Sequence, residues 1–177
     1  MLRLFAALPI RSDIADQLVP LQQGVPGAKW RPRENFHITL RFFGDVDPNL
    51  AVDLDMALGE IKAPQMKIAL SGVGWFGTRE PYSLWAGVAF NAALAELASV
   101  FERPARRLGL HLEKRKYQPH VTLAYCHHTL PEDAARFADK HKGFKTPEFW
   151  ADRFYLYSSQ LGNGPSRYRI EAEYPLL

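Results

Sequence analysis

A short pattern of histidine, threonine and leucine occurs twice in this chain. Phe36-His37-Ile38-Thr39-Leu40 in the first half recurs as Pro119-His120-Val121-Thr122-Leu123 in the second. An unperturbed histidine titrates at about pH 6.5, so near neutral pH one imidazole can accept a proton while another donates one. A threonine hydroxyl can hydrogen-bond a non-bridging oxygen of a phosphate. The repeat therefore indicates acid–base chemistry on a phosphate ester, and no acidic metal-ligand cluster accompanies it.

Both copies are predicted to be β-strands, because polar and apolar residues alternate along them. In the first copy, His37, Thr39 and Arg41 share one face, with Phe43 further along the same face. The second copy alternates in the same way. Each strand thus has an apolar face for a core and a polar face turned away from it. One copy alone would indicate a satisfied histidine in a sheet, whereas two facing copies would line a groove with two imidazoles and two hydroxyls.

Helices and strands alternate irregularly along the chain. Capping residues predict helix starts at Ser12, Asp47 and Asn91, and Thr129 with Glu132 predicts a capping box for a fourth helix. Alternating or apolar segments predict strands at 3–8, 36–43, 67–77, 84–90, 110–114, 121–126, 154–159 and 168–174. This order is typical of a mixed α+β fold. No Ser/Gly linker divides the chain, so we expect residues 1–177 to form a single domain of two packed lobes.

The composition is that of a globular domain, with 177 residues of which 47% are hydrophobic and 23% charged. The single cysteine, Cys126, cannot form an internal disulfide, which favours a reducing, cytoplasmic location. No apolar run approaches the roughly 18 residues that a membrane span needs. His127 and His128 follow Cys126, but neighbours in a strand point to opposite faces, so a metal site is disfavoured.

The basic residues form two clusters, although the net charge is only +3, from 22 basic and 19 acidic side chains. One cluster comprises Lys29, Arg31 and Arg33, and the other lies within 103–116. Each lies just upstream of a His-x-Thr copy. A basic cluster alone most often forms solvated surface, but this shared placement favours an anionic ligand.

Residues spread along the whole chain carry a resemblance to a known family. They are Arg3-Leu4-Phe5-Ala6-Ala7-Leu8-Pro9, Trp30, Asn35, the first His-x-Thr copy, Phe42-Phe43-Gly44-Asp45-Val46, Tyr117-Gln118-Pro119 with the second copy, Leu156-Tyr157-Ser158-Ser159, Gly164 and Tyr168. In this order they resemble the two-histidine (2H) phosphoesterases, and within these the LigT-like RNA 2′,3′-cyclic phosphodiesterases.

The resemblance implies an α+β fold of two pseudo-twofold-related lobes. Each would be a mostly antiparallel sheet with helices on its outer face, around a central cleft. It implies cofactor-free opening of a 2′,3′-cyclic phosphate at an RNA end, such as a tRNA fragment, to a 2′-phosphate, with 2′-5′ ligation as the reverse reaction. It also implies that His37 is the general acid, that His120 is the general base, and that Thr39 and Thr122 hold the phosphate. We expect a monomer without membrane contact.

One position departs from the family pattern. The family often carries an arginine five residues after the second histidine, and here that position is Tyr125. Another cation must then steady the phosphate, and alternation along the strand favours Arg41. Arg115 and Lys116 are the alternative candidates for this cation, because they lie just before the second copy. Alternation also favours Phe43 as a ring that could stack on a nucleobase.

Two other functions stay open from the sequence alone. The same site could act on a 2′-5′ oligonucleotide or a small cyclic nucleotide. The chain could also be an RNA-binding protein that has lost catalysis, which the two intact motifs disfavour and Tyr125 keeps possible. Activity on a 2′,3′-cyclic mononucleotide in the presence of a chelator separates an enzyme from a binding protein.

Overall fold

Ten strands and five α-helices make up the chain in the computed structural model, which describes residues 1–177. The strands are β1 (Leu2–Pro9), β2 (Ala28–Trp30), β3 (His37–Val46), β4 (Met66–Ile68), β5 (Leu70–Phe76), β6 (Ser83–Val88), β7 (His120–Cys126), β8 (Phe149–Ala151), β9 (Arg153–Gly162) and β10 (Gly164–Pro175). The helices are α1 (Ser12–Leu18), α2 (Pro48–Gly59), α3 (Ala92–Val100), α4 (Glu102–Arg107) and α5 (Pro131–Lys140), with 3₁₀ turns at Val19–Leu21 and Arg33–Asn35.

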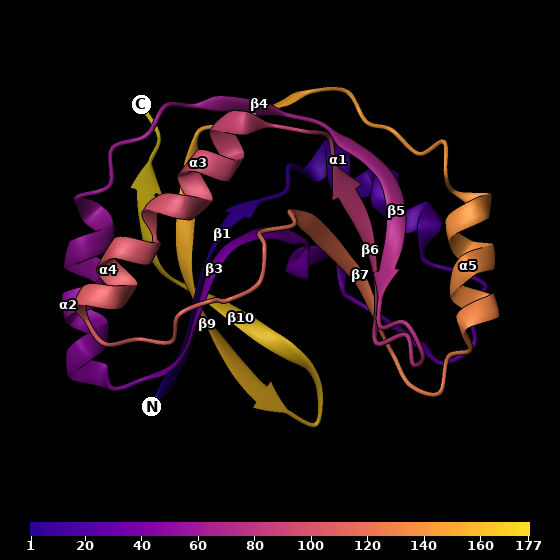
Figure 1. Ribbon diagram of the computed structural model, residues 1–177, viewed down its shortest axis with the longest axis horizontal. Helices are drawn as coiled ribbons and strands as arrows, with labels where there is room; N and C mark the ends of the chain where they lie inside the picture. The colour runs from indigo at the N-terminus through magenta and orange to yellow at the C-terminus, as the bar shows by residue number, and fades with distance from the viewer.

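The main sheet divides into two halves that meet at the two His-x-Thr strands. Its order is β10-β9-β1-β3-β7-β6-β5, with β2 also paired to β7. Strands β3 and β7 join through one residue pair, Ile38 with Val121, whereas the other neighbours share longer antiparallel ladders. Figure 1 shows the result: β1, β3, β9 and β10 belong to one lobe, and β5, β6 and β7 belong to the other.

Helices cover the outer side of each lobe. Helices α2, α3 and α4 lie on the side of the first lobe, and α5 lies on the far side of the second (Figure 1). The predicted caps form at two of these helices: the Asp47 side chain accepts from the Asn49 amide, and Asn91 accepts from the Leu94 amide. The predicted class, an α+β fold of two lobes with largely antiparallel sheets and outer helices, is confirmed. No helix here is both long enough and apolar enough to cross a membrane.

The chain passes between the lobes several times, so neither lobe is a continuous half of the sequence. Strand β4 follows α2 on the way to the second lobe, and β8 precedes β9 on the way back. These two connections pair as a separate two-stranded sheet, which runs along the top of Figure 1. A third connection, residues 108–119 from α4 to β7, crosses in front of the main sheet (Figure 1). We call it the crossing loop.

A β-bulge in β3 changes which side chains face the core. Ala7 of β1 lies opposite Thr39 but Ala6 lies opposite Arg41, so Leu40 is an extra residue in the ladder. Alternation therefore reverses after Thr39. Phe43 is 1% exposed in the core, whereas Phe42 is 37% exposed. The prediction that Phe43 could stack on a nucleobase is wrong for this reason.

Two local predictions in the second half of the chain are also wrong. Residues 110–114 form no strand but part of the crossing loop. The Thr129 hydroxyl caps no helix, because it donates to the carbonyl of Pro26, and α5 begins at Pro131 after an uncapped Leu130. For Thr129, a partner distant in sequence takes the place of the local cap.

Candidate active site

The two histidines of the repeated motif are held by the same backbone contact. Nδ1 of His37 lies 2.7 Å from the carbonyl oxygen of Asn35, and Nδ1 of His120 lies 2.7 Å from that of Gln118. A carbonyl can only accept, so Nδ1 carries the proton in each ring. In the neutral form this leaves Nε2 unprotonated, and Nε2 of His37 lies 3.0 Å from the Thr39 hydroxyl, which donates to it.

Aromatic rings surround each imidazole within its own lobe. The ring centres of Phe5 and Tyr168 lie 5.0 and 5.4 Å from that of the first histidine. The ring centres of Phe76 and Trp85 lie 5.0 and 6.0 Å from that of the second. These rings come from β1 and β10 in one lobe and from β5 and β6 in the other. They fix the plane of each imidazole and exclude water from its edges.

Burial lowers the pKa of both histidines. For His37 it lowers the pKa to about 4, against the opposing effect of the hydrogen bond to Asn35, and the nearby charges of His120 and Arg31 lower it further. For His120 burial lowers the pKa, again against its backbone hydrogen bond. Both rings are therefore neutral at pH 7 in the free protein, and each offers Nε2 as a proton acceptor.

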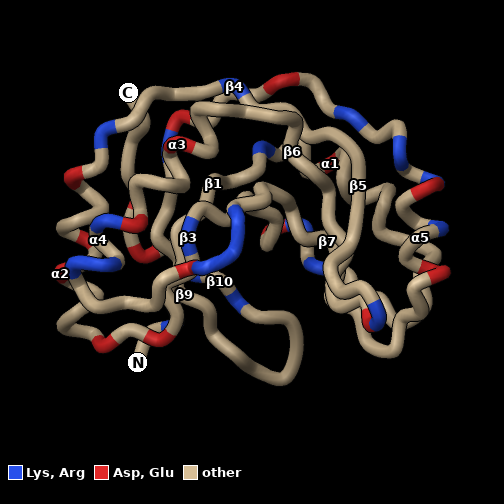
Figure 2. Tube along the Cα trace, in the orientation of Figure 1, with Lys and Arg blue, Asp and Glu red and all other residues tan.

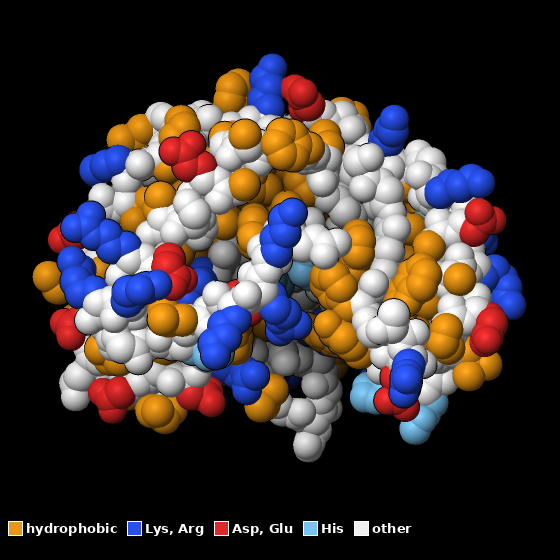
Figure 3. Space-filling model, in the orientation of Figure 1, with side chains coloured by type: hydrophobic (Ala, Val, Ile, Leu, Met, Phe, Trp, Pro, Cys, Tyr) orange, Lys and Arg blue, Asp and Glu red, His pale blue; other side chains and the backbone are white.

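A cleft of about 650 Å³ opens beside the histidine pair. His120, Thr122 and Thr39 lie on its wall. Its other lining residues come from β3, α3, α4, the crossing loop and the β5–β6 turn, and include Phe42, Phe76, Tyr82, Ser83, Ser99, Glu102, Glu113, Arg115, Lys116, Tyr117, Gln118 and Tyr125. Figure 3 shows this face hollowed at its centre, with basic side chains across the front of the hollow. His120 and both threonines of the repeat therefore line the cleft, and His37 adjoins it through its contact with Thr39.

Arg41 also lines this cleft, but two of its guanidinium nitrogens are already bound within the protein. Its guanidinium donates to the Glu102 carboxylate at 2.8 Å and to the His111 carbonyl at 2.9 Å, and the residue is 8% exposed. The bulge at Leu40 is the cause, because it turns Arg41 towards α4 instead of leaving it on the face of His37. The prediction that Arg41 projects freely beside His37 is therefore wrong.

Arg115 and Lys116 lie at the rim of the cleft, on the crossing loop. The loop appears as a basic segment in front of the sheet in Figure 2. The Arg115 side chain is 82% exposed, and its charge is partly balanced by Glu113, which lies 3.6 Å away. Tyr117 anchors the loop, because its hydroxyl donates to the carbonyl of Thr39 at 2.8 Å. These two cations can therefore meet the phosphates of a longer anionic chain that enters the cleft.

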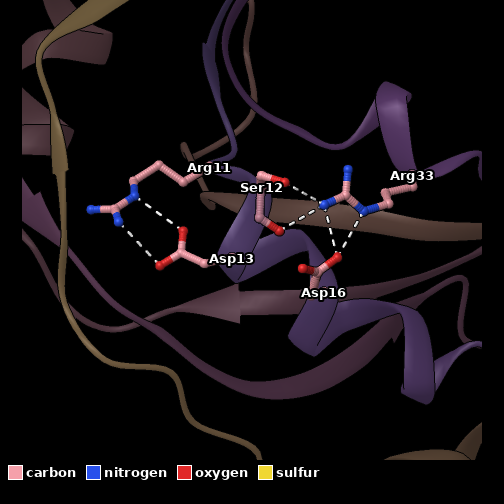
Figure 4. A network of polar contacts seen from close by, with 5 residues as sticks. All are labelled: Arg11, Ser12, Asp13, Asp16 and Arg33. Carbon is pink, nitrogen blue, oxygen red and sulfur yellow. Dashed lines mark hydrogen bonds and ion pairs between the residues drawn. The ribbon is translucent and has the colours of Figure 1, made fainter.

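Of the first basic cluster, Arg33 faces away from the site. It donates to the Asp16 carboxylate and to the hydroxyl and carbonyl of Ser12, which fixes the turn before His37 against α1 (Figure 4). Figure 4 also shows the neighbouring pair of Arg11 and Asp13. Arg33 thus supports the structure next to the site, and no part of its charge is directed into the cleft.

Arg31, from the same cluster, lies against Tyr125 of the cleft wall, although the sequence analysis did not name it as a site residue. Its guanidinium carbon lies 4.9 Å from the ring centre of Tyr125, and Tyr125 lines the cleft at 44% exposure. The two residues meet because β2 pairs with β7, with Lys29 opposite Tyr125. In the sequence, the basic character of residues 29–33 was the only signal for Arg31. Its contact with Tyr125 depends on strand pairing, which the sequence alone does not show. Phe76 of β5 also lines the cleft.

Two α+β lobes that each contribute a His-x-Thr strand to one cleft define a class of two-histidine phosphoesterases. A family model described as LigT like Phosphoesterase matches residues 8–85 and 88–166 of this chain. The chain belongs to this family of LigT-like phosphoesterases, which confirms the resemblance noted from the sequence.

Curated relatives and solved structures match along most of the chain. An RNA 2′,3′-cyclic phosphodiesterase of Geobacillus stearothermophilus is 32% identical over 98% of this chain, and the match spans 57% of that relative's length. One of Archaeoglobus fulgidus is 31% identical over 75% of this chain and 77% of its own. The crystal structure of E. coli LigT complexed with 3′-AMP superposes with a TM-score of 0.79 at 22% identity, covering 99% of this chain and 98% of that one. The last likeness supports the fold alone.

Proposed function

We propose that this chain hydrolyses 2′,3′-cyclic phosphate ends of RNA to 2′-phosphates, with His37 and His120 as acid and base. The observation that carries this is a pair of imidazoles with fixed Nδ1 atoms, one lining the cleft and the other joined through Nε2 to Thr39 of the cleft wall. The curated relatives are named RNA 2′,3′-cyclic phosphodiesterases, which supports the choice of substrate. In this function the chain acts in the cytoplasm as a monomer.

In the reaction that we propose, water attacks the phosphorus atom and the bond from phosphorus to the 3′-oxygen breaks. Nε2 of His120 takes the proton of the water, and protonated Nε2 of His37 gives a proton to the departing 3′-oxygen. The products are a 2′-phosphate and a 3′-hydroxyl. A bound phosphate anion favours the imidazolium form, so His37 acquires its proton as substrate binds. Thr39 and Thr122 donate to the non-bridging oxygens.

The cleft beyond the histidines supports an RNA end as the substrate. Phe42, Tyr82 and Tyr125 are exposed by 37%, 49% and 44%, and all three line the cleft. Exposed aromatic rings bind unpaired bases by stacking, which contributes about 1–3 kcal/mol per base. Arg115 and Lys116 at the rim would contact the phosphates that precede the cyclic end.

The direct test is hydrolysis of a 2′,3′-cyclic mononucleotide and of an RNA oligonucleotide with a 2′,3′-cyclic end, each with EDTA present. We expect turnover of both, a 2′-phosphate product, and a higher kcat/KM for the oligonucleotide. Exclusive formation of a 3′-phosphate, or no turnover of either substrate, would overturn the proposal. Cleavage of a 2′-5′ oligonucleotide in preference to both would identify the alternative substrate class.

A further inference from the structure

A phosphate between His37 and His120 needs a cation close to it, because negative charge on its oxygens grows as water attacks. A cation held in place in a site from which water is largely excluded stabilises such charge most. Two cations near the cleft are already balanced: Arg41 by Glu102 and Arg115 in part by Glu113. Of the cations that remain, Lys116 lies on the crossing loop at the rim of the cleft, and Arg31 is held against β7 beside the second motif.

The backbone of Arg31 is fixed against the strand of the second motif. Its N–H donates to the carbonyl of Leu123 at 2.8 Å. Its own carbonyl accepts from the side-chain amide of Gln22 at 2.9 Å, and the same amide donates to the carbonyl of Leu123 at 3.0 Å. The start of the Arg31 side chain is therefore held at a constant position beside β7.

The guanidinium of Arg31 contacts residues of the site, and one of its nitrogens has no hydrogen-bond partner. It lies over the ring of Tyr125, and its Nη2 atom is shielded from solvent with no hydrogen-bond partner. Its charge is one of the influences that lower the pKa of His37, after burial and His120. Burial raises the pKa of Tyr168, and the charge of Arg31 opposes that rise, so Arg31 also lies near this residue of β10.

A buried guanidinium nitrogen without an acceptor is costly, since its desolvation is not repaid by a hydrogen bond. No carboxylate forms an ion pair with Arg31 to offset this cost. An anionic oxygen in the space shared by His37, Tyr125 and Tyr168 would satisfy both the charge and the unused N–H. A planar guanidinium is well suited to this, because it can bind two phosphate oxygens together.

We propose that Arg31 binds the non-bridging oxygens of the phosphate beside His37, with Tyr125 as the ring that supports its guanidinium. Tyr125 stands where the family resemblance implied an arginine, so the neighbouring strand segment supplies the cation that β7 lacks. This assignment rests on the proposed function, since it names the residue that holds the phosphate in that reaction.

The test compares Arg31→Gln with Arg33→Gln, a matched change of a basic residue that faces α1. Two quantities are measured: kcat and KM on a 2′,3′-cyclic mononucleotide, and the affinity for inorganic phosphate followed by NMR of the histidine rings. We expect Arg31→Gln to lower kcat/KM by about 10²-fold and to weaken phosphate binding in parallel. Arg33→Gln should leave both within about twofold. Arg31→Lys should recover part of the loss, because lysine keeps the charge without the planar fork.

A second variant separates binding from folding. Arg31→Gln combined with Tyr125→Arg places a cation on β7 instead. We expect kcat/KM of this double variant to be at least about tenfold higher than that of Arg31→Gln alone. Undiminished phosphate affinity in Arg31→Gln would overturn the assignment. If Arg31→Gln does not fold, Arg31→Lys decides, and phosphate affinity equal to that of the wild type would overturn it. If the wild type binds phosphate through Arg31 but opens no cyclic phosphate, the proposed function fails and the assignment stands.

Discussion

His37 and His120 lie in adjacent strands, and each donates its Nδ1–H over 2.7 Å to the carbonyl two residues earlier in its own chain segment. The contact is local to each motif, so each strand sets the tautomer of its own histidine. The two lobes therefore present the same ring atom, Nε2, to the space between them. A reaction that removes one proton and adds another needs such a pair.

Loss of either imidazole should abolish most of the activity without unfolding the protein. We expect His37→Ala and His120→Ala each to lower turnover of a cyclic mononucleotide by about 10²–10⁴-fold, the usual contribution of a general acid or base. His127→Ala is the control, because His127 is exposed. Circular dichroism should show native spectra for all three. More than a tenth of wild-type turnover in either motif variant would contradict the two-histidine mechanism.

Changing the leaving group of the substrate can show which histidine is the general acid and which is the general base. In a phosphodiester of 4-nitrophenol, the leaving group departs as a stable anion without a proton. Cleavage of this substrate therefore does not need the general acid. We expect His37→Ala to lose much less turnover on this substrate than on a cyclic mononucleotide, whereas His120→Ala loses activity on both. The reverse pattern would assign the base to His37, in line with its low pKa in the free protein.

The pKa of His37 also makes stability depend on pH. In the unfolded chain this residue titrates near 6.5, and burial lowers its pKa to about 4 in the folded protein. Between these values the unfolded state binds more protons, so the free energy of unfolding falls as the pH falls through this window. The loss from this residue amounts to at most about 3 kcal/mol. Urea unfolding at pH 7 and pH 4.5 measures this loss. Between these pH values the free energy of unfolding should decrease less in His37→Asn than in the wild type.

The sequence allowed the motif and its chemistry to be predicted because both depend on local information. Strict alternation up to Thr39 shows which residues share a face, and the caps at Asp47 and Asn91 lie within three residues of their partners. The basic crossing loop was likewise visible as a run of charge. Such signals need no knowledge of how distant segments meet.

The features that the sequence did not reveal all depend on long-range pairing. The register between β1 and β3 shifts at Leu40 and again at Phe43, and these irregularities move Arg41 and Phe43 off the expected face. The place of Arg31 over Tyr125 requires that β2 pair with β7. Neither the bulge in β3 nor the pairing of β2 with β7 can be detected from the alternation of polar and apolar residues.

The crossing loop should loosen when its contact with β3 is removed. Tyr117→Phe deletes the hydroxyl that donates to the Thr39 carbonyl at 2.8 Å and changes nothing else in the ring. We expect a loss of about 1 kcal/mol in the free energy of unfolding, the usual contribution of one hydrogen bond. We also expect faster amide exchange in 108–119 than in the wild type. The substitution should raise the KM for an RNA oligonucleotide more than it raises the KM for a mononucleotide. Unchanged exchange in this segment would show that other contacts hold the loop.

Arg41 and Arg31 should differ in what they stabilise, although both lie near the His37 strand. Two nitrogens of the Arg41 guanidinium donate to Glu102 and to the His111 carbonyl, and its Nε is buried without a partner. Arg41→Met should therefore lower Tm, because it leaves the His111 carbonyl and one Glu102 oxygen without their donors. Phosphate affinity should stay within about threefold of the wild type. The matched variant Glu102→Gln should lower Tm less, since it keeps an acceptor for Arg41. Weaker phosphate binding in Arg41→Met than in Arg31→Gln, with Tm unchanged, would return the role of phosphate ligand to Arg41.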